Sequence, residues 1–238
     1  PIAEYNPIEC VKTNIGGSEN VITAAIDNKV KRVIALSTDK ASNPVNLYGA
    51  TKLASEKLFL SAHSLVGLQN TKFGVVRYGN VINSRGSVIP LFKELLKKGN
   101  TKIPITNPEM TRFFLTLEQS VKFVINSISS ITNSELFIPK MYSLKIVDLL
   151  KSLDPKAKHN VIGIRQGEKV HEILFSTEES RYILEFESHY VIFQHLRHLN
   201  KFKPSIKSKV KKIDKEFYYT SKNNKDFLSL EKIKKVFP

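Results

Sequence analysis

The sequence predicts an α/β fold in which helices cover both faces of a parallel β-sheet, and three observations support this prediction. Short runs rich in β-branched and other apolar residues occur at 32–37, 73–78 and 135–139. They alternate with segments whose apolar residues recur at helical spacing. Such alternation is typical of β-α-β units, which build parallel sheets through right-handed crossovers. The composition allows a real core, because 41% of the residues are hydrophobic and 25% are charged.

The individual elements follow from apolar spacing and from signals at their ends. Pro44 fits the first turn of a helix, and Asn43 is a possible cap for it. Ser143 is the expected cap of a later helix, and Gly99 follows the end of another. In chain order, helices are predicted at 21–26, 44–58, 88–98, 117–128, 143–153, 168–174 and 228–236, and strands at 32–37, 73–78, 135–139 and 161–164.

The charge balance favours an acidic partner. The chain carries 37 Lys and Arg residues against 22 Asp and Glu, a formal net charge of +15. Nucleic acid, an anionic membrane surface or a phosphorylated small molecule would each suit such a balance. No basic stretch is interleaved with aromatic residues as in RNA-binding modules, so a nucleic-acid binder that uses 201–215 is the least favoured function. The simplest interpretation of 200–215 is a mobile or extended, solvated basic segment.

Several classes of protein are disfavoured by what the sequence lacks. The single cysteine, Cys10, cannot form an internal disulfide, which fits a reducing compartment. No apolar run approaches the length of a membrane span, and no charged-then-apolar leader opens the chain. We therefore expect a cytoplasmic protein without a membrane partner. His195 and His198 are spaced like half of a metal site, but no second ligand pair accompanies them, so no metal is expected.

The residues that carry chemistry gather where the strand 32–37 ends. Thr38, Asp39 and Lys40 follow it closely, while Tyr48 and Lys52 lie four residues apart and share one helix face. An ammonium beside a phenol stabilises the phenolate, which lowers the pKa of Tyr48. A phenolate can take a proton from a substrate hydroxyl while hydride leaves the same carbon, and Thr38 could hydrogen-bond that hydroxyl. Taken alone, the Tyr-x-x-x-Lys spacing is more often an exposed lysine beside a half-buried tyrosine.

A longer run makes the pattern specific. The segment 35–52, ALSTDKASNPVNLYGATK, resembles the extended branch of the short-chain dehydrogenase/reductase superfamily. Within that branch it is similar to the inverting UDP-N-acetylglucosamine 4,6-dehydratases of pseudaminic acid synthesis and to related polysaccharide-biosynthesis proteins. The resemblance covers roughly residues 1–187 and returns weakly at 216–227. Further motifs match in the same order: NIGGSEN at 14–20, RYGNVINSRGS at 77–87, MTRF at 110–113 and GIRQGEKVHE at 163–172.

This resemblance implies a reaction. The chain would oxidise C4 of UDP-N-acetylglucosamine, remove water across C5 and C6 and reduce C6, with NADP as the cofactor and NAD as the alternative. Tyr48 would be the base at the sugar O4, with Lys52 lowering its pKa and holding the nicotinamide ribose. Lys40 would remove the C5 proton and Asp39 would protonate the departing C6 hydroxyl. An Asp-Lys pair is typical of the inverting enzymes, whereas the retaining ones show Asp-Glu.

The Asp39–Lys40 assignment has a requirement and an alternative. A base must be neutral, so Lys40 has to be held without its proton, which nearby Lys52 and burial would favour. The alternative is an exposed ion pair that follows a strand.

The remaining site residues are also assigned by resemblance. Tyr78 would join Tyr48 and Lys52 in binding the cofactor. For Ser84, Arg85 and Ser87 the alternative is a polar loop that binds no ligand, and for Arg112 and Arg165 it is an arginine at the surface. The predicted substrate-binding residues are Asn80 at the sugar or diphosphate, Ser84, Arg85 and Ser87 at phosphate oxygens, Arg112 and Arg165 at the diphosphate, and Glu168 at the uridine ribose.

The expected organisation is a partial doubly wound, Rossmann-like sheet that lacks its first strands. No G-x-G-x-x-G pattern occurs, and only one helix precedes the strand 32–37. Residues 1–140 would form the C-terminal half of an NAD(P)-binding domain with interspersed substrate-binding segments. Residues 141–187 would form a smaller nucleotide-sugar-binding part, and 188–238 a basic C-terminal extension. We expect a homo-oligomer, or a companion chain that supplies the missing half. Without that half, the chain would bind a nucleotide sugar but not turn it over.

Overall fold

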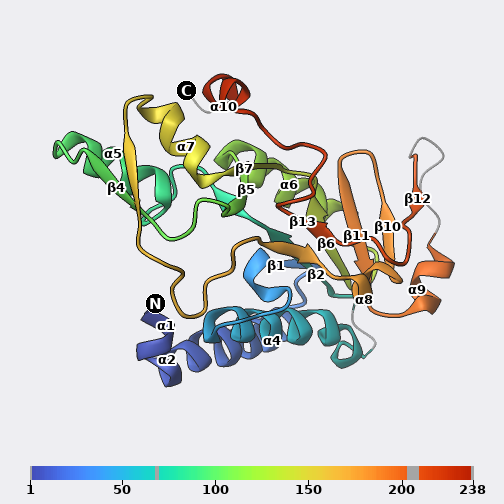
Figure 1. The fold of residues 1–238 in the computed structure, drawn as a ribbon. Coiled ribbons are helices and arrows are strands. Elements are labelled where there is room, and N and C mark those ends of the chain that lie inside the picture. The colour runs from blue at the N-terminus through green and yellow to red at the C-terminus, as the bar shows by residue number, and fades with distance from the viewer. Residues whose placement is uncertain (1, 68–69, 203–208, 237–238) are drawn as a thin grey trace. The chain divides into compact units, whose positions relative to one another are not determined.

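A computed structural model describes residues 2–67, 70–202 and 209–236 (Figure 1). The chain forms two compact units, each assembled from three separate segments. The predicted boundary after residue 140 is one of the points where the chain passes between units. The division into three consecutive functional parts remains a prediction. The first unit comprises Pro1–Tyr78, Val121–Lys140 and Ile173–Tyr218, and the second Gly79–Ser120, Met141–Glu172 and Tyr219–Pro238.

The first unit is built on a mixed sheet whose strand order is β1-β2-β6-β11-β10-β12. The parallel part contains the three strands predicted with the correct type and near-correct ends: β1 (Arg32–Thr38), β2 (Lys72–Tyr78) and β6 (Glu135–Pro139). The antiparallel part adds β11 (His189–Phe193), β10 (Ile183–Glu185) and β12 (Lys211–Lys212). The expected α/β class with a parallel sheet is confirmed.

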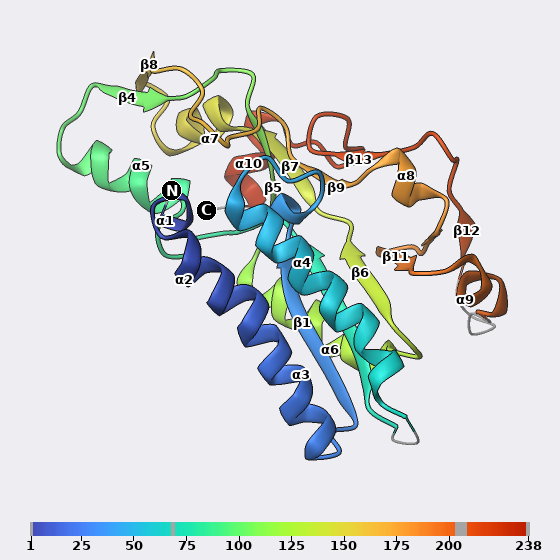
Figure 2. The same cartoon turned by 90° about the horizontal axis from the view of Figure 1, so that it is seen from below.

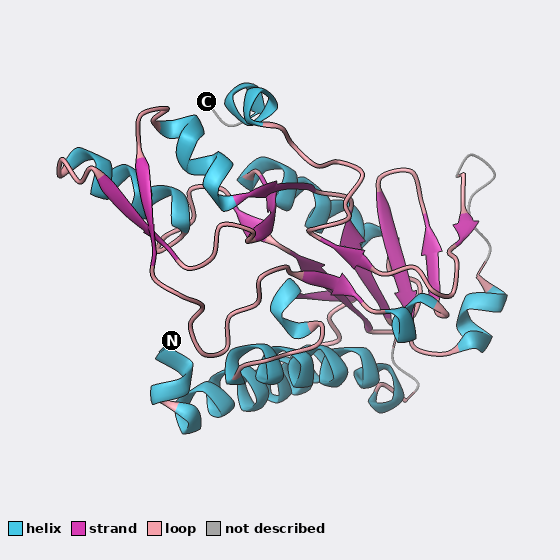
Figure 3. Ribbon diagram, viewed as in Figure 1, coloured by secondary structure: helices cyan, strands magenta, loops and turns pink. Residues whose placement is uncertain are grey.

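Helices cover both faces of this sheet, because successive residues of a strand point to opposite sides. Phe73 of β2 meets Phe59 of α4 (Leu47–Ser61), with ring centroids 6.3 Å apart. Val76 of the same strand packs in a cluster with Val124 of α6 (Leu117–Ser130) on the other side. Figure 3 shows the helices of the two faces in cyan, separated by the magenta strands.

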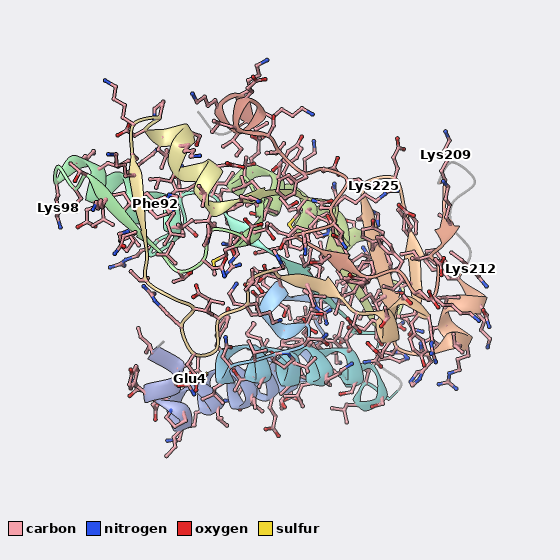
Figure 4. The ribbon with its side chains drawn as sticks, viewed as in Figure 1. Glu4, Phe92, Lys98, Lys209, Lys212 and Lys225 are labelled. Carbon is pink, nitrogen blue, oxygen red and sulfur yellow. The ribbon has the colours of Figure 1, made fainter. Side chains whose placement is uncertain are left out.

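The N-terminal helices run alongside α4 (Figure 2). They are α1 (Ile2–Tyr5), α2 (Pro7–Val11) and α3 (Gly17–Asp27), and a π-helical turn, Lys12–Gly16, joins the last two. Glu4 of α1 accepts a hydrogen bond from the Leu47 backbone N–H at 2.6 Å (Figure 4 labels Glu4). A carboxylate at this position stabilises the N-terminus of α4.

Two predicted helix caps are wrong. Helix α4 begins at Leu47, and its cap is Asn46, whose side chain accepts from the Gly49 N–H at 2.8 Å. Pro44 therefore lies before the helix, and Asn43 adopts a left-handed φ of 46°. Ser143 lies within the strand β7 (Tyr142–Lys145), and the following helix α7 (Ile146–Leu153) begins three residues later than predicted.

Two other predicted elements differ near the 163–172 motif. The strand expected at 161–164 is found earlier, as β8 (Lys158–Val161). No helix forms at 168–174, where an extended segment leads into β9 (Ile173–Phe175). The carbonyl groups of Lys169 and Val170 accept hydrogen bonds from the Arg112 guanidinium instead of from helical N–H groups. A tertiary contact thus replaces the helical hydrogen bonds that local spacing indicated.

The second unit has its own core between short strands and helices. Phe92 of α5 (Val88–Lys97) is buried there with Phe114 of β5 (Thr111–Leu115) and Leu150 of α7. Lys98, just after α5, instead points outward (Figure 4). The predicted helix at 88–98 is confirmed, and the one at 228–236 is found as α10 (Leu230–Val236). In this unit, β3 (Asn80–Val81) pairs with β5, and β4 (Lys102–Ile105) pairs with β8.

The predicted basic extension, 188–238, contributes to the main sheet, because β11 pairs with β6 over its whole length. Within the predicted basic segment 200–215, α9 (Leu196–Lys201) precedes residues 203–208, which lie outside the described part of the chain. Lys211 and Lys212 then form β12 at the outer edge (Figure 4 labels Lys212). No helix in the described ranges is both long and apolar enough to cross a membrane.

Candidate active site and nucleotide-sugar region

The C-terminal end of β1 carries the predicted acid and base. The strand passes directly into a 3₁₀ turn, Asp39–Ala41, so Asp39 and Lys40 are held at the sheet edge. Lys40 Nζ lies 3.0 Å from Asp39 Oδ1, which also accepts from Thr38 Oγ1 at 3.0 Å. The alternative of an exposed ion pair fits only in part, because the Asp39 side chain is fully buried and that of Lys40 is 33% exposed.

Gly49 brings helix α4 against this turn. A Cβ atom at Gly49 would lie 2.2 Å from the Lys40 carbonyl oxygen, far inside contact distance. Only glycine therefore allows the first turn of α4 to approach the turn so closely. The neighbouring residue, Tyr48, stays 40% exposed, so its phenol remains accessible to a ligand.

Burial and several charged neighbours affect the pKa of Tyr48. Burial raises the pKa of Tyr48; the Lys40 ammonium opposes that shift, whereas Asp39 and Cys10 add to it. The expectation that Lys52 lowers the pKa of Tyr48 stays a prediction. The Lys52 ammonium donates to the Leu36 carbonyl at 2.6 Å. Burial lowers the pKa of Lys52, opposed by Glu56 on the next turn.

Tyr78 stands at the end of the strand next to β1. It is the register partner of Thr38 in the parallel pair, so both residues reach the same edge of the sheet. Burial raises the pKa of Tyr78, and a charge on Tyr48 raises it further, which indicates that the two phenols are neighbours. The residues predicted to bind the cofactor are thus brought together within the first unit.

Arg77 is a buried structural residue that we did not single out from the sequence. Its guanidinium makes a bidentate pair with Glu56 of α4 at 2.9 and 2.6 Å. It also donates to the Leu174 carbonyl at 2.7 Å and to Glu179 of α8 (Thr177–Ser180) at 3.1 Å. These carboxylates raise the pKa of Arg77 despite its complete burial. An arginine within an otherwise apolar buried strand was the available signal, because a buried charge requires a partner.

The predicted phosphate loop lies in the second unit, between β3 and α5. Asn80 belongs to β3, and Asn83 and Gly86 both have positive φ, at 58° and 75°. The Ser87 backbone N–H donates to the Ser84 carbonyl at 3.0 Å. The Ser87 hydroxyl is buried and has no hydrogen-bond partner within the described residues. Arg85 is exposed on the same loop.

Arg112 anchors the 163–172 segment rather than standing free for a ligand. Its guanidinium donates to the carbonyl groups of residues 111, 169 and 170 at 2.8 to 3.1 Å. It also faces Glu168 at 3.8 Å and Glu172 at 3.5 Å. Arg165 is exposed on the segment that Arg112 holds. The predicted diphosphate role of both arginines stays a prediction, and Arg165 is the one whose side chain is accessible.

His171 is a second residue that we missed. Its Nδ1 lies 2.8 Å from the Thr111 hydroxyl, which is in turn 2.7 Å from the Ser221 hydroxyl. Burial, Lys222 and Arg112 lower the pKa of His171. The motif 163–172 contained His171, but only the fold shows that it contacts β5.

The two predicted metal-type histidines also lie together. The rings of His195 and His198 are 5.4 Å apart in an edge-on arrangement. Within the described ranges, no three His, Cys, Asp or Glu residues are grouped so that they could hold a metal ion.

Comparison with known proteins identifies the family. The family model described as "polysaccharide biosynthesis protein" matches residues 1–194. The chain belongs to this family. It is 51% identical over 228 residues to the UDP-N-acetylglucosamine 4,6-dehydratase (inverting) of Campylobacter jejuni subsp. jejuni serotype O:2, a match that covers 94% of this chain and 68% of that protein. The resemblance predicted from the motifs is confirmed.

Solved structures agree with this membership of the polysaccharide biosynthesis protein family. The chain matches Pen from Bacillus thuringiensis with a TM-score of 0.88 and 37% identity, over 99% of this chain and 71% of that one. DesIV, a dTDP-glucose 4,6-dehydratase from Streptomyces venezuelae, matches with a TM-score of 0.58 and 19% identity, over 69% of this chain and 56% of that one. The second likeness shows a shared fold, which is the expected Rossmann-like α/β fold.

Proposed function

We propose that this chain carries the catalytic residues of an inverting UDP-N-acetylglucosamine 4,6-dehydratase that serves surface-glycan synthesis. The observation that carries the proposal is the 3.0 Å contact of Lys40 with Asp39 at the end of β1, beside Tyr48. This contact supports an acid and a base that share one sheet edge with an accessible phenol. The carboxyl ends of parallel strands are where such folds bind ligands.

The residues present fit a nicotinamide cofactor and a sugar. Ser37 Oγ and Asp39 Oδ2 are buried at the end of β1 and have no hydrogen-bond partner within the described residues. Unpaired buried polar atoms are costly, so they point to a polar ligand at this edge. Tyr48, Lys52 and Tyr78 would hold the cofactor. When bound, the nicotinamide would accept hydride from C4 and return it to C6.

Tyr48 would act first, as the base at the sugar O4. Its pKa is raised by burial, and the cation that opposes this shift is Lys40. Lys40 would therefore favour the phenolate while C4 is oxidised. Thr38, whose hydroxyl contacts Asp39, would orient the sugar hydroxyl.

The Asp39–Lys40 pair would then eliminate water. An ammonium cannot accept a proton, but transfer of one proton over the 3.0 Å contact would leave a neutral amine and a carboxylic acid. The amine of Lys40 could then take the C5 proton, which the 4-keto group acidifies. The acid form of Asp39 could protonate the departing C6 hydroxyl. One internal proton transfer would thus prepare both groups.

Binding of the UDP-sugar would fall to the second unit. Asn80 would meet the sugar or diphosphate, and the buried Ser87 hydroxyl suits a phosphate oxygen. Ser84 and Arg85 would complete the phosphate contacts, and Glu168 would accept a hydrogen bond from the uridine ribose. Because Arg112 is engaged with backbone carbonyls, Arg165 would supply the bidentate contact to the diphosphate.

The finer assignments are also part of this proposal. We propose NADP as the cofactor, with NAD as the alternative, and a homo-oligomeric assembly in the cytoplasm. The single cysteine, Cys10, is compatible with a reducing compartment. Turnover measured with each cofactor, and the molar mass in solution, test these points.

A second candidate function has an observation of its own. Strand β1 pairs with β2 on one side and with no described strand on the other. Leu36 of this strand is 46% exposed, and Val121 and Ile125 of α6 are 50% and 58% exposed. An open strand edge beside apolar side chains invites pairing with another polypeptide. The chain would then bind the nucleotide sugar and turn it over only with a companion chain that completes the cofactor site.

Turnover distinguishes the two candidates. The purified chain is incubated with UDP-N-acetylglucosamine and NADP, and the mixture is analysed for a 4-keto-6-deoxy sugar nucleotide. The first proposal predicts product that is lost in Tyr48→Phe and kept in the surface variant Lys57→Ala on the same helix. Binding of UDP without product supports the second candidate. A folded chain that binds neither UDP nor cofactor contradicts both.

A further inference from the structure

Helix α4 meets the N-terminal helices through polar side chains close to Tyr48. Asn14 and Ser18 follow each other at a spacing of four residues, as do Thr51 and Ser55 on α4, so each pair shares a helix face. Asn14 Nδ2 donates to Thr51 Oγ1 at 3.0 Å, and the hydroxyl oxygens of Ser18 and Ser55 are 2.6 Å apart. These four residues are called the polar seam.

Three of the four residues of the polar seam are buried, and Asn14 is half-buried. Thr51 is 2% exposed, Ser55 5% and Ser18 7%. Farther from Tyr48, the next positions of the same two rows are Ile22 and Phe59, which are buried and apolar. The polar contacts are therefore confined to the half of the helix pair nearest the catalytic residues.

Hydrogen bonds restrict the helices in a way that apolar contacts do not. Apolar burial is non-directional, so it tolerates a helix that slides along its partner. The contacts that cross between the helices, Asn14 to Thr51 and Ser18 to Ser55, form at one axial position only, whereas the Ser18 hydroxyl also donates to the Asn14 carbonyl of its own segment. A slip by one residue would move α4 by about 1.5 Å. A buried polar contact that selects one register is known from coiled coils.

The seam is linked to Tyr48 directly. Thr51 Oγ1, which accepts from Asn14, also donates to the Tyr48 carbonyl at 3.0 Å. Cys10, one turn before Asn14, lies 3.4 Å from the same hydroxyl and is close enough to raise the pKa of Tyr48. On its other side, the first turn of α4 touches the Lys40 carbonyl through Gly49.

We propose that the polar seam sets the axial position of α4 and thereby places the Tyr48 phenol against Lys40. Asn14, Ser18, Thr51 and Ser55 are positioning residues, because they act through the helix and not on the substrate. This inference rests on the proposed function for the roles of Tyr48 and Lys40. It gives a role to four residues that had none: Asn14, Ser18 and Thr51 lie in the matched motifs, and Ser55 lies outside them.

The test separates positioning from stability by removing both partners of one contact. The double variant Ser18→Ala/Ser55→Ala leaves no buried hydroxyl unpaired, and such paired removal is close to neutral for stability. Thr51→Val removes the hydroxyl that contacts Asn14, and Thr51→Ser restores it. Ser61→Ala is the matched control, because the Ser61 hydroxyl bonds only to Leu58 within its own helix.

Two readouts are used. In the first, 3-fluorotyrosine at position 48 is titrated by ¹⁹F NMR, which reports the phenol independently of turnover. The double variant and Thr51→Val should shift this titration upward, because α4 no longer holds the phenol at Lys40. In the second, kcat should fall about tenfold at unchanged KM, since small displacements of reacting groups have effects of this order. Thr51→Ser and Ser61→Ala should keep wild-type values in both.

The proposal is overturned if the folded double variant keeps both the wild-type titration and the wild-type kcat. It is also overturned if Ser61→Ala shows the same changes, since loss of any hydroxyl on α4 would then suffice. Absence of turnover in the wild-type chain would count against the proposed function, and the ¹⁹F titration would still decide the role of the seam.

Discussion

Replacing Gly49 by alanine should lower both the stability of the fold and the rate of catalysis, and the two losses can be measured separately. The added Cβ would lie 2.2 Å from the Lys40 carbonyl oxygen and 3.1 Å from Pro44 Cβ. Real Cβ contacts are almost never shorter than 3.0 Å, so α4 and the turn must separate by at least 3.0 − 2.2 = 0.8 Å. Overpacking of this kind costs about 1–3 kcal/mol. A misplacement of about 1 Å at reacting groups can lower the rate 10²-fold.

Two measurements test this prediction. Urea unfolding gives the loss of stability, and turnover of UDP-N-acetylglucosamine under conditions where the variant is fully folded gives the loss of kcat. Gly17→Ala is the matched control, because its new Cβ would have no neighbour nearer than 3.9 Å and it lies within α3. That variant should be more stable than wild type by about 0.4–1 kcal/mol. A Gly49→Ala protein with wild-type kcat would refute the claim that this contact positions Tyr48.

Three further predictions concern a buried arginine, a buried histidine and the segment that Arg112 holds. Arg77→Met should lower the free energy of unfolding by about 3–5 kcal/mol, because it leaves Glu56 buried without its partner. A loss below about 1 kcal/mol in urea unfolding would contradict a stabilising role of the Arg77–Glu56 ion pair. Burial lowers the pKa of His189 from 6.5 to about 4. The folded state therefore binds fewer protons than the unfolded state between these values, so stability is full above pH 6.5 and declines as the pH falls towards 4. The decline should be about 2–3 kcal/mol, and it should be absent in His189→Phe; equal slopes in both proteins would exclude His189 as its source. Arg112→Gln should speed amide hydrogen exchange at 169–172 and weaken UDP binding, whereas the control Lys156→Gln should do neither. Unchanged hydrogen exchange in Arg112→Gln would show that the guanidinium does not hold the segment.

The parallel strands and the candidate catalytic cluster were predictable because local signals determine them. The apolar run of β1 and the residues Thr38, Asp39 and Lys40 are adjacent in the chain, so their order already places them at one strand end. Tyr48 and Lys52 share a helix face by spacing alone. The spacing could not show which groups set the pKa of Tyr48, because the Lys40 ammonium that opposes the effect of burial comes from the turn after β1.

The errors occurred where distant contacts override local preference. The segment 168–174 has helical spacing, but Arg112 takes the carbonyl groups that a helix would use. The five-residue strand β5 carries Arg112 and was not predicted at all. Likewise, the partners of Arg77 lie 21 and 102 residues away, which no local pattern encodes. Contacts between such distant segments become apparent only when the chain is folded.

The most direct test of the central claim is to separate the oxidation step from the elimination step. Lys40→Met and Tyr48→Phe are each incubated with UDP-N-acetylglucosamine and NADP, and both the reduced nicotinamide and the sugar product are followed. We predict that Lys40→Met still forms reduced cofactor and a 4-keto sugar that keeps its C6 hydroxyl, but more slowly than wild type because Tyr48 loses the cation that favours its phenolate. Tyr48→Phe should form neither. Loss of water in Lys40→Met, or C4 oxidation in Tyr48→Phe, would contradict the division of roles between the phenol and the Asp39–Lys40 pair.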